Sequence, residues 1–303
     1  MELRVLRYFV QVARDESITK AAQSLHISQP TLSKQMKDLE TELGVRLFER
    51  TNYAVRLTPE GIRLRLRAED ILAMADQTMN EFTHKDRTVS GDLRIGAAEG
   101  EPVRILGMVM HKLADQYPGI IYHMYTGDTE LLKEKLDNGF LDFFLICEEP
   151  DLHRYQAITL PIEDTWGLVM KKDDPLAAKN SISISDLSKL PLIVSRQALH
   201  QDLAHLFGSA VHRMHFRATY DLAHNASLLV KEGFGYLLTF EYLIDISEES
   251  GLAFRPLRPA LHTRSHLIYR KYQIFSEAAE LFLDTVQETI SRYPSDNSAE
   301  TSS

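Results

Sequence analysis

The stretch "SLHISQPTLSKQMKDLE", residues 24–40, decides the fold of the N-terminal part of the chain. Ser28 precedes the apolar pattern as a helix cap, and Pro30 falls in the first turn, where its missing N–H costs nothing. The apolar side chains recur at helical spacing: Leu32, Met36 and Leu39. The pattern predicts an amphipathic helix whose donor-rich polar side faces away from the protein.

The residues on either side predict two more helices and a hairpin. Apolar spacing indicates a first helix within residues 3–13, and Ser17 is placed to cap a second over about 18–25. Only residues 26–28 connect the second helix to the third, which is the turn length of a helix-turn-helix. Alternating residues in 46–58 predict a two-stranded wing.

A long helix is predicted over about 59–88, because no proline follows Pro59 there and no glycine follows Gly61. Its apolar side is either a dimer seam or a surface packed on the same domain. We favour the dimer seam, since no neighbouring segment is expected to cover that side. The seam residues are Leu64, Ala68, Ile71, Leu72, Ala75, Thr78, Met79 and Phe82.

Strands and helices alternate through residues 91–293. Near-continuous apolar strands separated by helices predict parallel sheets that are covered on both faces. The polar end, residues 294–303, is expected to be disordered. Strands are predicted at 92–98, 120–126, 141–147, 166–171, 191–195, 214–219 and 235–240, and helices at 103–116, 129–138, 199–208 and 223–232.

Charge is divided unevenly along the 303 residues, whose net charge is −9. Residues 1–67 carry 12 Lys and Arg against 8 Asp and Glu, whereas residues 91–303 carry 20 against 30. A basic front and an acidic back are expected when only one module meets a polyanion. The single cysteine, Cys147, excludes an intramolecular disulfide, and no signal peptide or membrane-spanning run is visible, so we expect a cytoplasmic protein.

The residues from 3 to 61 resemble the DNA-binding region of LysR-type transcriptional regulators. Three motifs occur in the family's order: "AAQSLHISQPTLSKQMKDLE", "LGVRLFER" and "LTPEG". Further along, "GDLRIG", "LDNGFLDFFL", "PLIVSR" and "LLVKEGFGYLL" are similar to landmarks of the family's effector domain. The resemblance covers almost the whole chain and is strongest at the front.

The resemblance implies an all-α winged helix-turn-helix domain at 1–58 and a linker helix for dimerisation at 59–90. An α/β, two-lobed, periplasmic-binding-protein-like effector domain would follow at 91–293. Lobe one would comprise about 91–163 and 267–293, and lobe two about 164–266, with crossings near 163–165 and 264–266. The implied partners are promoter DNA, RNA polymerase, a small-molecule effector and further copies of the chain, as a homotetramer built from dimers.

The same resemblance places the second helix of the motif in the major groove of DNA. Gln29 can pair with adenine, Pro30 can contact a thymine methyl, and Ser33 can reach a base or a phosphate. Tyr53 stands where many relatives carry a basic residue, which weakens the case for minor-groove insertion by the wing. Backbone contacts are expected from Thr31, Lys34, Lys37, Arg50, Asn52 and Arg56.

Ligands of such a fold bind between the lobes, at strand ends and helix N-termini. Glu99, Gly100 and Glu101 follow a strand and should border that cleft. Two glutamates there indicate either a neutral or cationic effector or ordinary helix-start residues, and we favour the second interpretation. By position in the resemblance, the other cleft candidates are Thr129, Cys147, Ser195, Arg196, Asn225 and Phe240.

Other functions fit the sequence less well. Cys147 has no partner thiol, so apolar packing is favoured over redox sensing. Apart from one pair spaced by three residues, His200, His205, His212 and His215 match no compact zinc motif, and we expect neither a metal nor a cofactor. The sequence contains no catalytic motif that would indicate an enzyme and no signal peptide that would indicate a periplasmic solute-binding protein. A third alternative, an architectural DNA binder, would differ from a regulator by not responding to an effector. The effector, the target genes and the sign of regulation are not specified by the sequence.

Overall fold

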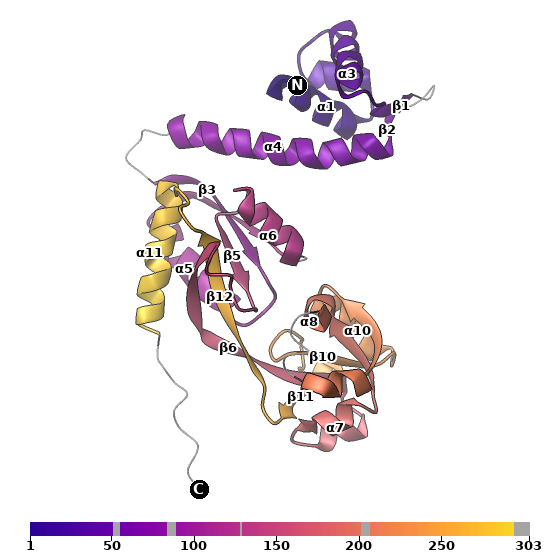
Figure 1. Cartoon of the computed structure of the whole chain (residues 1–303), viewed down its shortest axis with the longest axis vertical. Helices are drawn as coiled ribbons and strands as arrows, with labels where there is room; N and C mark the ends of the chain where they lie inside the picture. Colours follow the sequence, from indigo (N-terminus) through magenta and orange to yellow (C-terminus); the bar gives the residue numbers. More distant parts are fainter. Residues whose placement is uncertain (51–54, 84–88, 128, 201–206, 294–303) are drawn as a thin grey trace. The chain divides into compact units, whose positions relative to one another are not determined.

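A computed structural model of the chain describes residues 1–50, 55–83, 89–127, 129–200 and 207–293. The chain forms two compact units, Met1–Lys85 and Asp86–Ser303, which are considered separately (Figure 1). No helix in the described ranges is long and apolar enough to cross a membrane.

The first unit is a winged helix-turn-helix, as expected. Its three short helices pack on one another around Phe9, Leu32 and Met36, none of which is exposed to solvent. The two wing strands pair in antiparallel register. The elements are α1 (Leu3–Asp15), α2 (Ile18–Ser24), α3 (Gln29–Leu43), β1 (Phe48–Arg50), β2 (Val55–Leu57) and α4 (Pro59–Thr83).

Both predicted caps of the helix-turn-helix are confirmed. The Ser17 hydroxyl accepts a hydrogen bond from the Lys20 N–H at 3.3 Å, and Ser28 accepts one from the Thr31 N–H at 3.3 Å. Pro30 lies in the first turn of α3. At the other end, Gly44 has φ +70°, a left-handed conformation that glycine adopts without strain, and it ends the helix. Local sequence therefore fixes both ends of α3.

Part of the dimer seam predicted on the long helix α4 is instead packed within the first unit. Ala68 and Leu72 are buried in the core of the first unit, where α4 packs against α1, and Leu64 packs against the same core. An ion pair between Arg7 and Asp76 also joins α1 to α4. The expectation that nothing nearby covers this side was therefore wrong for its first half, while Ile71 and Met79 remain exposed.

The second unit is built on a sheet of ten strands within the described residues, in the order β4-β3-β5-β12-β6-β10-β8-β9; β11 also pairs with β6, and β7 pairs with β11. The strands are β3 (Ser90–Ala97), β4 (Gly119–Tyr125), β5 (Phe143–Ile146), β6 (Tyr155–Lys171), β7 (Ile182–Ser183), β8 (Pro191–Ser195), β9 (His215–Tyr220), β10 (Tyr236–Phe240), β11 (Leu252–Arg258) and β12 (His262–Arg270). The α-helices are α5 (Val103–Ala114), α6 (Thr129–Asp137), α7 (Ile184–Leu187), α8 (Arg196–His200), α10 (Ala223–Lys231) and α11 (Glu277–Ser291). Short 3₁₀ helices lie at η1 (Pro175–Ala178), η2 (Gly208–Arg213) and η3 (Glu248–Ser250).

The sheet is mixed, so the prediction of parallel sheets was only partly right. β3 pairs in parallel with β4 and β5, and β8 does so with β9 and β10. β6 and β12 run antiparallel to their other neighbours and to each other. Residues 155–165 alternate exposed and buried positions, and this more polar first part of β6 was not recognised as a strand.

β6 carries the chain from one half of the sheet to the other (Figure 1). We call the half around β3, β4 and β5 lobe one, and the half around β8, β9 and β10 lobe two. Where the halves meet, Glu163, Asp164 and Thr165 of β6 pair with residues 262–264 of β12. Two adjacent strands, β6 and β12, thus connect the lobes.

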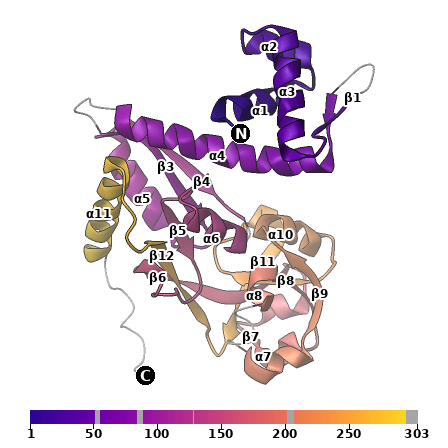
Figure 2. The same cartoon turned by 45° about the horizontal axis from the view of Figure 1, so that its top comes forward.

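Helices cover both faces of each lobe, as predicted. In lobe one, α5 and α11 pack side by side over one face, and α6 packs on the other with Leu132 and Leu136 (Figure 2). In lobe two, α10 lies over Ile193 and Leu237, while Trp166 and neighbouring side chains form a second core. Each lobe therefore has its own hydrophobic core.

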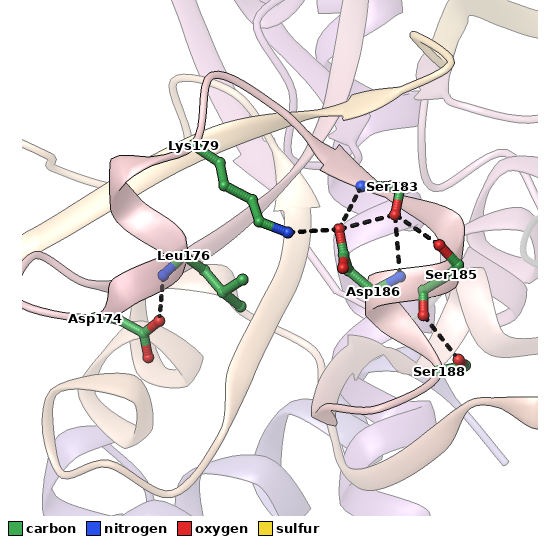
Figure 3. A network of polar contacts seen from close by, with 7 residues as sticks. All are labelled: Asp174, Leu176, Lys179, Ser183, Ser185, Asp186 and Ser188. Carbon is green, nitrogen blue, oxygen red and sulfur yellow. Dashed lines mark hydrogen bonds and ion pairs between the residues drawn. The ribbon is translucent and has the colours of Figure 1, made fainter.

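A capping box begins α7 in lobe two, and Figure 3 shows the contacts around it. The Asp186 carboxylate accepts hydrogen bonds from the Ser183 hydroxyl at 2.8 Å and from the Lys179 ammonium at 3.0 Å. The Ser183 hydroxyl in turn accepts the Asp186 N–H at 3.2 Å. The bonds from Ser183 and Lys179 lower the pKa of Asp186 to about 2.

Candidate nucleic-acid interface and ligand cleft

The first turn of α3 presents the predicted base-reading residues. Gln29 and Pro30 are exposed, whereas Ser33 is half-buried. Thr31 is exposed, and its hydroxyl lies 2.7 Å from that of Ser28, within the cap. Because the cap uses the Ser28 hydroxyl and not the Gln29 side chain, the amide of Gln29 is available to a partner.

Lys34 and Lys37 extend this surface along α3. Both are exposed, and neither forms an ion pair or a side-chain hydrogen bond with a described residue. Pro30, Lys34 and Lys37 are separated by four and three residues, so they lie on the same side of the helix. Two unpaired ammonium groups beside the first turn suit contacts with a phosphate backbone.

A carboxylate on α3 holds the wing in place. One oxygen of Glu40 in α3 accepts the N–H of Leu47 at 2.7 Å and that of Phe48 at 3.1 Å. Arg56 is exposed on β2, opposite Glu49. The predicted contacts Asn52 and Arg50 are not placed, since residues 51–54, which include Tyr53, and the Arg50 side chain lie outside the described residues.

A cavity of about 70 Å³ lies between the lobes of the second unit. Its lining follows the carboxyl ends of β3, β4 and β5 in lobe one and of β8, β9 and β10 in lobe two, the position where open α/β sheets bind ligands. The described lining residues are Ala98, Glu99, Thr126, Gly127, Cys147, Trp166, Ser195, Gln197, Ala198, Tyr220, Asp221, Thr239, Phe240 and Leu243.

Four of the predicted effector residues meet in this cavity: Glu99, Cys147, Ser195 and Phe240. The Glu99 carboxylate crosses between the lobes and accepts the N–H of Ala223, the first residue of α10, at 2.9 Å. The ring of Phe240 packs edge-to-face on Trp166, with centroids 4.5 Å apart. Buried Cys147 lies with its sulfur 3.5 Å from the Ser265 hydroxyl.

The other five predicted residues lie outside the lining. Glu101 pairs at 2.7 Å with Arg104 of the adjoining helix, which fits the helix-start interpretation for this residue. Thr129 is buried at the start of α6, and Asn225 is exposed on α10. Arg196 forms an ion pair at 3.1 Å with the lining residue Asp221.

Gly100 packs against the crossing strand instead of the cavity. A Cβ added there would lie 2.6 Å from Oδ2 of Asp164, so the close approach requires glycine. The other Asp164 oxygen accepts the Glu101 N–H at 2.8 Å. Asp164 is buried, its Oδ2 has no hydrogen-bond partner among the described residues, and burial raises its pKa to about 7.

Several lining residues were missed by the sequence analysis. Thr126 and Asp221 come directly after β4 and β9, and Thr239 is near the end of β10. Polar residues that follow buried strands were the signal that could have found them. No such signal pointed to Trp166, whose indole N–H donates to the Thr263 hydroxyl at 2.8 Å and so holds the ring in place.

Two family models together match nearly all of the described chain. Residues 3–62 match the "Bacterial regulatory helix-turn-helix protein, lysR family", and residues 86–291 match the "LysR substrate binding domain". Relatives agree with this assignment. A hydrogen peroxide-inducible genes activator of Pectobacterium carotovorum subsp. carotovorum is 28% identical, over 97% of this chain and 98% of that protein.

Other relatives and solved structures point the same way. The dual regulator OxyR of Escherichia coli (strain K12) is 30% identical over 72% of this chain and 73% of its own length. The structure of full-length CbnR with its target DNA has a TM-score of 0.73 at 21% identity, over 95% of this chain and 100% of that one, and shows the same fold. The chain therefore belongs to the LysR family of bacterial DNA-binding transcriptional regulators, which are not enzymes.

Proposed function

We propose that this regulator binds promoter DNA through α3 and the wing, and that a small molecule between the lobes of the second unit controls the binding. The exposed row of donors at the capped amino end of α3 carries this proposal. A helix end of this kind can enter the major groove with its side chains at the base edges. The regulator would act in the cytoplasm, where promoter DNA is located.

The residues of this surface divide into two groups on DNA. Gln29, Pro30 and Ser33 would contact base edges, since an amide pairs with adenine and a pyrrolidine ring can touch a thymine methyl. Thr31, Lys34 and Lys37 would contact phosphates, which fix the register without reading sequence. Arg50, Asn52 and Arg56 would follow the backbone from the wing.

The effector would occupy the cavity that contains Glu99, Cys147, Ser195 and Phe240. Because the cavity is formed by both lobes, a ligand there contacts both and favours one angle between them. Such a ligand shifts the equilibrium only by its difference in affinity for the two angles. With Cys147 as the only cysteine, an intramolecular disulfide is impossible, so bound ligand and not disulfide formation would provide the signal.

Copies of the chain would associate through α4. Exposed apolar side chains remain along this helix after its contacts with α1: Ile62, Leu66, Ile71, Met74 and Met79. Several exposed apolar side chains on one helix are a frequent sign of an interface. A homotetramer, formed from two such dimers, would bind two DNA half-sites and present a surface to RNA polymerase.

A combined assay of DNA binding and assembly tests this proposal. Leu66→Glu should lower the mass measured by sedimentation and weaken binding to promoter DNA, because a charge at an apolar interface is costly. Arg63→Glu changes an exposed position of the same helix and provides the control. Wild-type protein that is folded but fails to retard DNA from the promoter region next to its own gene would contradict the proposal.

A further inference from the structure

The charged side chains of the cavity are not those expected of a site that binds an anionic ligand. Both walls carry a carboxylate, Glu99 from lobe one and Asp221 from lobe two. Among the described lining residues there is no lysine, arginine or histidine. Arg196 reaches Asp221 from outside the lining, but both side chains of this pair are about half exposed, so solvent screens the pair. The potential in the cavity therefore favours a cation.

One feature of the cavity that could attract an anion, the amino end of α10, is already occupied. The amino end of α10 has unpaired N–H groups, because Leu222 at the N-cap provides no side-chain hydrogen bond. Glu99 supplies the missing acceptor from the other lobe, at 2.9 Å from the Ala223 nitrogen. An anionic ligand would have to displace this carboxylate and then lie beside it, at a cost from like-charge repulsion.

Another part of the cavity lining is apolar and aromatic. Trp166 and Phe240 pack edge-to-face, and Leu243 lies beside them in the lining. The indole N–H of Trp166 is bonded to Thr263, so the ring offers its carbon surface and not a donor. A site that combines aromatic rings with carboxylates is a common arrangement for binding an organic cation.

We propose that the ligand of this cavity is a small organic cation, an amine or amidinium with an apolar or aromatic body. Its charged group lies beside Glu99 and Asp221, and its body lies against Trp166 and Phe240. This inference rests on the proposed function, in which the effector binds between the lobes, and it adds the chemical class of the ligand.

The Glu99 contact also gives the cation a way to act. A cationic group next to Glu99 competes with the Ala223 N–H for the carboxylate. When the carboxylate turns to the ligand, the bond that joins lobe one to α10 is lost. The ligand thereby has different affinities for the joined and the separated arrangement, which is the condition for shifting the equilibrium between them.

The test uses the full-length chain and three probes of matched size: benzylamine, benzoate and benzyl alcohol, at equal concentration and ionic strength near pH 7. We expect benzylamine to raise the thermal unfolding temperature and the other two to leave it unchanged. Glu99→Gln keeps an acceptor for the Ala223 N–H and should weaken benzylamine binding about tenfold or more. Glu101→Gln is the matched control, because that neighbouring carboxylate pairs with Arg104 outside the cavity, and it should not change the response.

Two outcomes would overturn the assignment. Stabilisation by benzoate that becomes stronger in Glu99→Gln would mean that an anion binds the amino end of α10. Equal effects of the three probes, or no effect of any, would also overturn it. A separate DNA mobility shift with unliganded protein distinguishes this failure from failure of the proposed function, since a regulator with a different ligand class still retards promoter DNA.

Discussion

The two sites of this chain are built in opposite ways. The DNA-binding surface lies on one exposed helix, and its base-reading and phosphate-binding candidates on α3 all fall within residues 29–37. The cavity is concave and takes its lining from six strand ends between residues 98 and 243. The first site depends on local sequence, whereas the second exists only after long-range folding.

Each unit also contains a carboxylate that holds a loop, and the two carboxylates differ in how well they are satisfied. One oxygen of Glu40 accepts two backbone N–H groups, from Leu47 and Phe48. Asp164 accepts one, from Glu101, and its second oxygen is buried with no partner among the described residues. The wing is therefore anchored by a stabilising contact, while the junction of the lobes contains a destabilising one.

The largest effect on stability is expected from removing the buried carboxylate of Asp164 at the junction of the lobes. Burial raises the pKa of Asp164 to about 7, above its usual 3.8, so the folded chain binds this proton more tightly than the unfolded chain does. Stability should fall as pH rises from about 4 to about 7 and stay reduced above that. Asp164→Asn should remove this loss and stabilise the chain at pH 8 by about 3 kcal/mol, measured by urea unfolding.

A neighbouring carboxylate provides the control for this prediction. Glu163 is on the same strand but partly exposed, and it pairs with Arg264 at 2.6 Å. Glu163→Gln should leave the pH profile unchanged. If the Asp164→Asn variant loses as much stability between pH 4 and pH 7 as the wild type, the loss does not come from ionisation of the buried Asp164 carboxyl.

The opposite result is expected at the wing anchor. Glu40→Ala leaves two N–H groups without their acceptor and should lower the free energy of unfolding by about 2 kcal/mol, with weaker DNA binding because the wing loses its attachment. Glu42→Ala, an exposed position in the same helix, should change stability by less than about 0.5 kcal/mol. Chemical denaturation and a mobility shift measure both effects, and equal behaviour of the two variants would refute the anchor.

A smaller effect is expected at Asp186, which behaves oppositely to Asp164. Hydrogen bonds from Ser183 and Lys179 lower its pKa to about 2, so the folded chain holds the ionised form. This contribution is present above pH 4 and is lost as pH falls through about 2. Asp186→Asn should therefore reduce stability by about 1 kcal/mol at pH 7 and by almost nothing near pH 2; a deficit that persists at pH 2 would contradict the ionic origin.

The contrast between the two sites explains how far the sequence could predict each. Ser28, Pro30 and the apolar spacing of α3 act within one helix, so the helix and its exposed side were correctly predicted. At the cavity, position after a strand indicated Glu99 and the family resemblance indicated Ser195, and both residues lie in the lining. Neither Arg196 nor Asn225 reaches the lining, because the direction of a side chain after a strand depends on tertiary packing.

Long-range packing also explains what was missed elsewhere. The first half of the predicted seam on α4 packs on α1, since Ala68 and Leu72 complete the core of the same unit. The first part of β6 is more polar than a buried parallel strand, because it lies beside β12 at the crossing. The burial and the raised pKa of Asp164 arise only when the loop at Gly100 packs against it.

The most direct test of the account compares Gln29→Ala with Lys34→Ala on DNA, using a cognate fragment selected from a random pool and a scrambled fragment, over a range of salt concentrations. Gln29→Ala should weaken cognate binding by about 1 kcal/mol, roughly fivefold, and leave scrambled binding unchanged. Lys34→Ala should weaken both equally and reduce the salt slope by about one. Equal losses on the two fragments for both variants would contradict the division of α3 into base-reading and phosphate-binding residues.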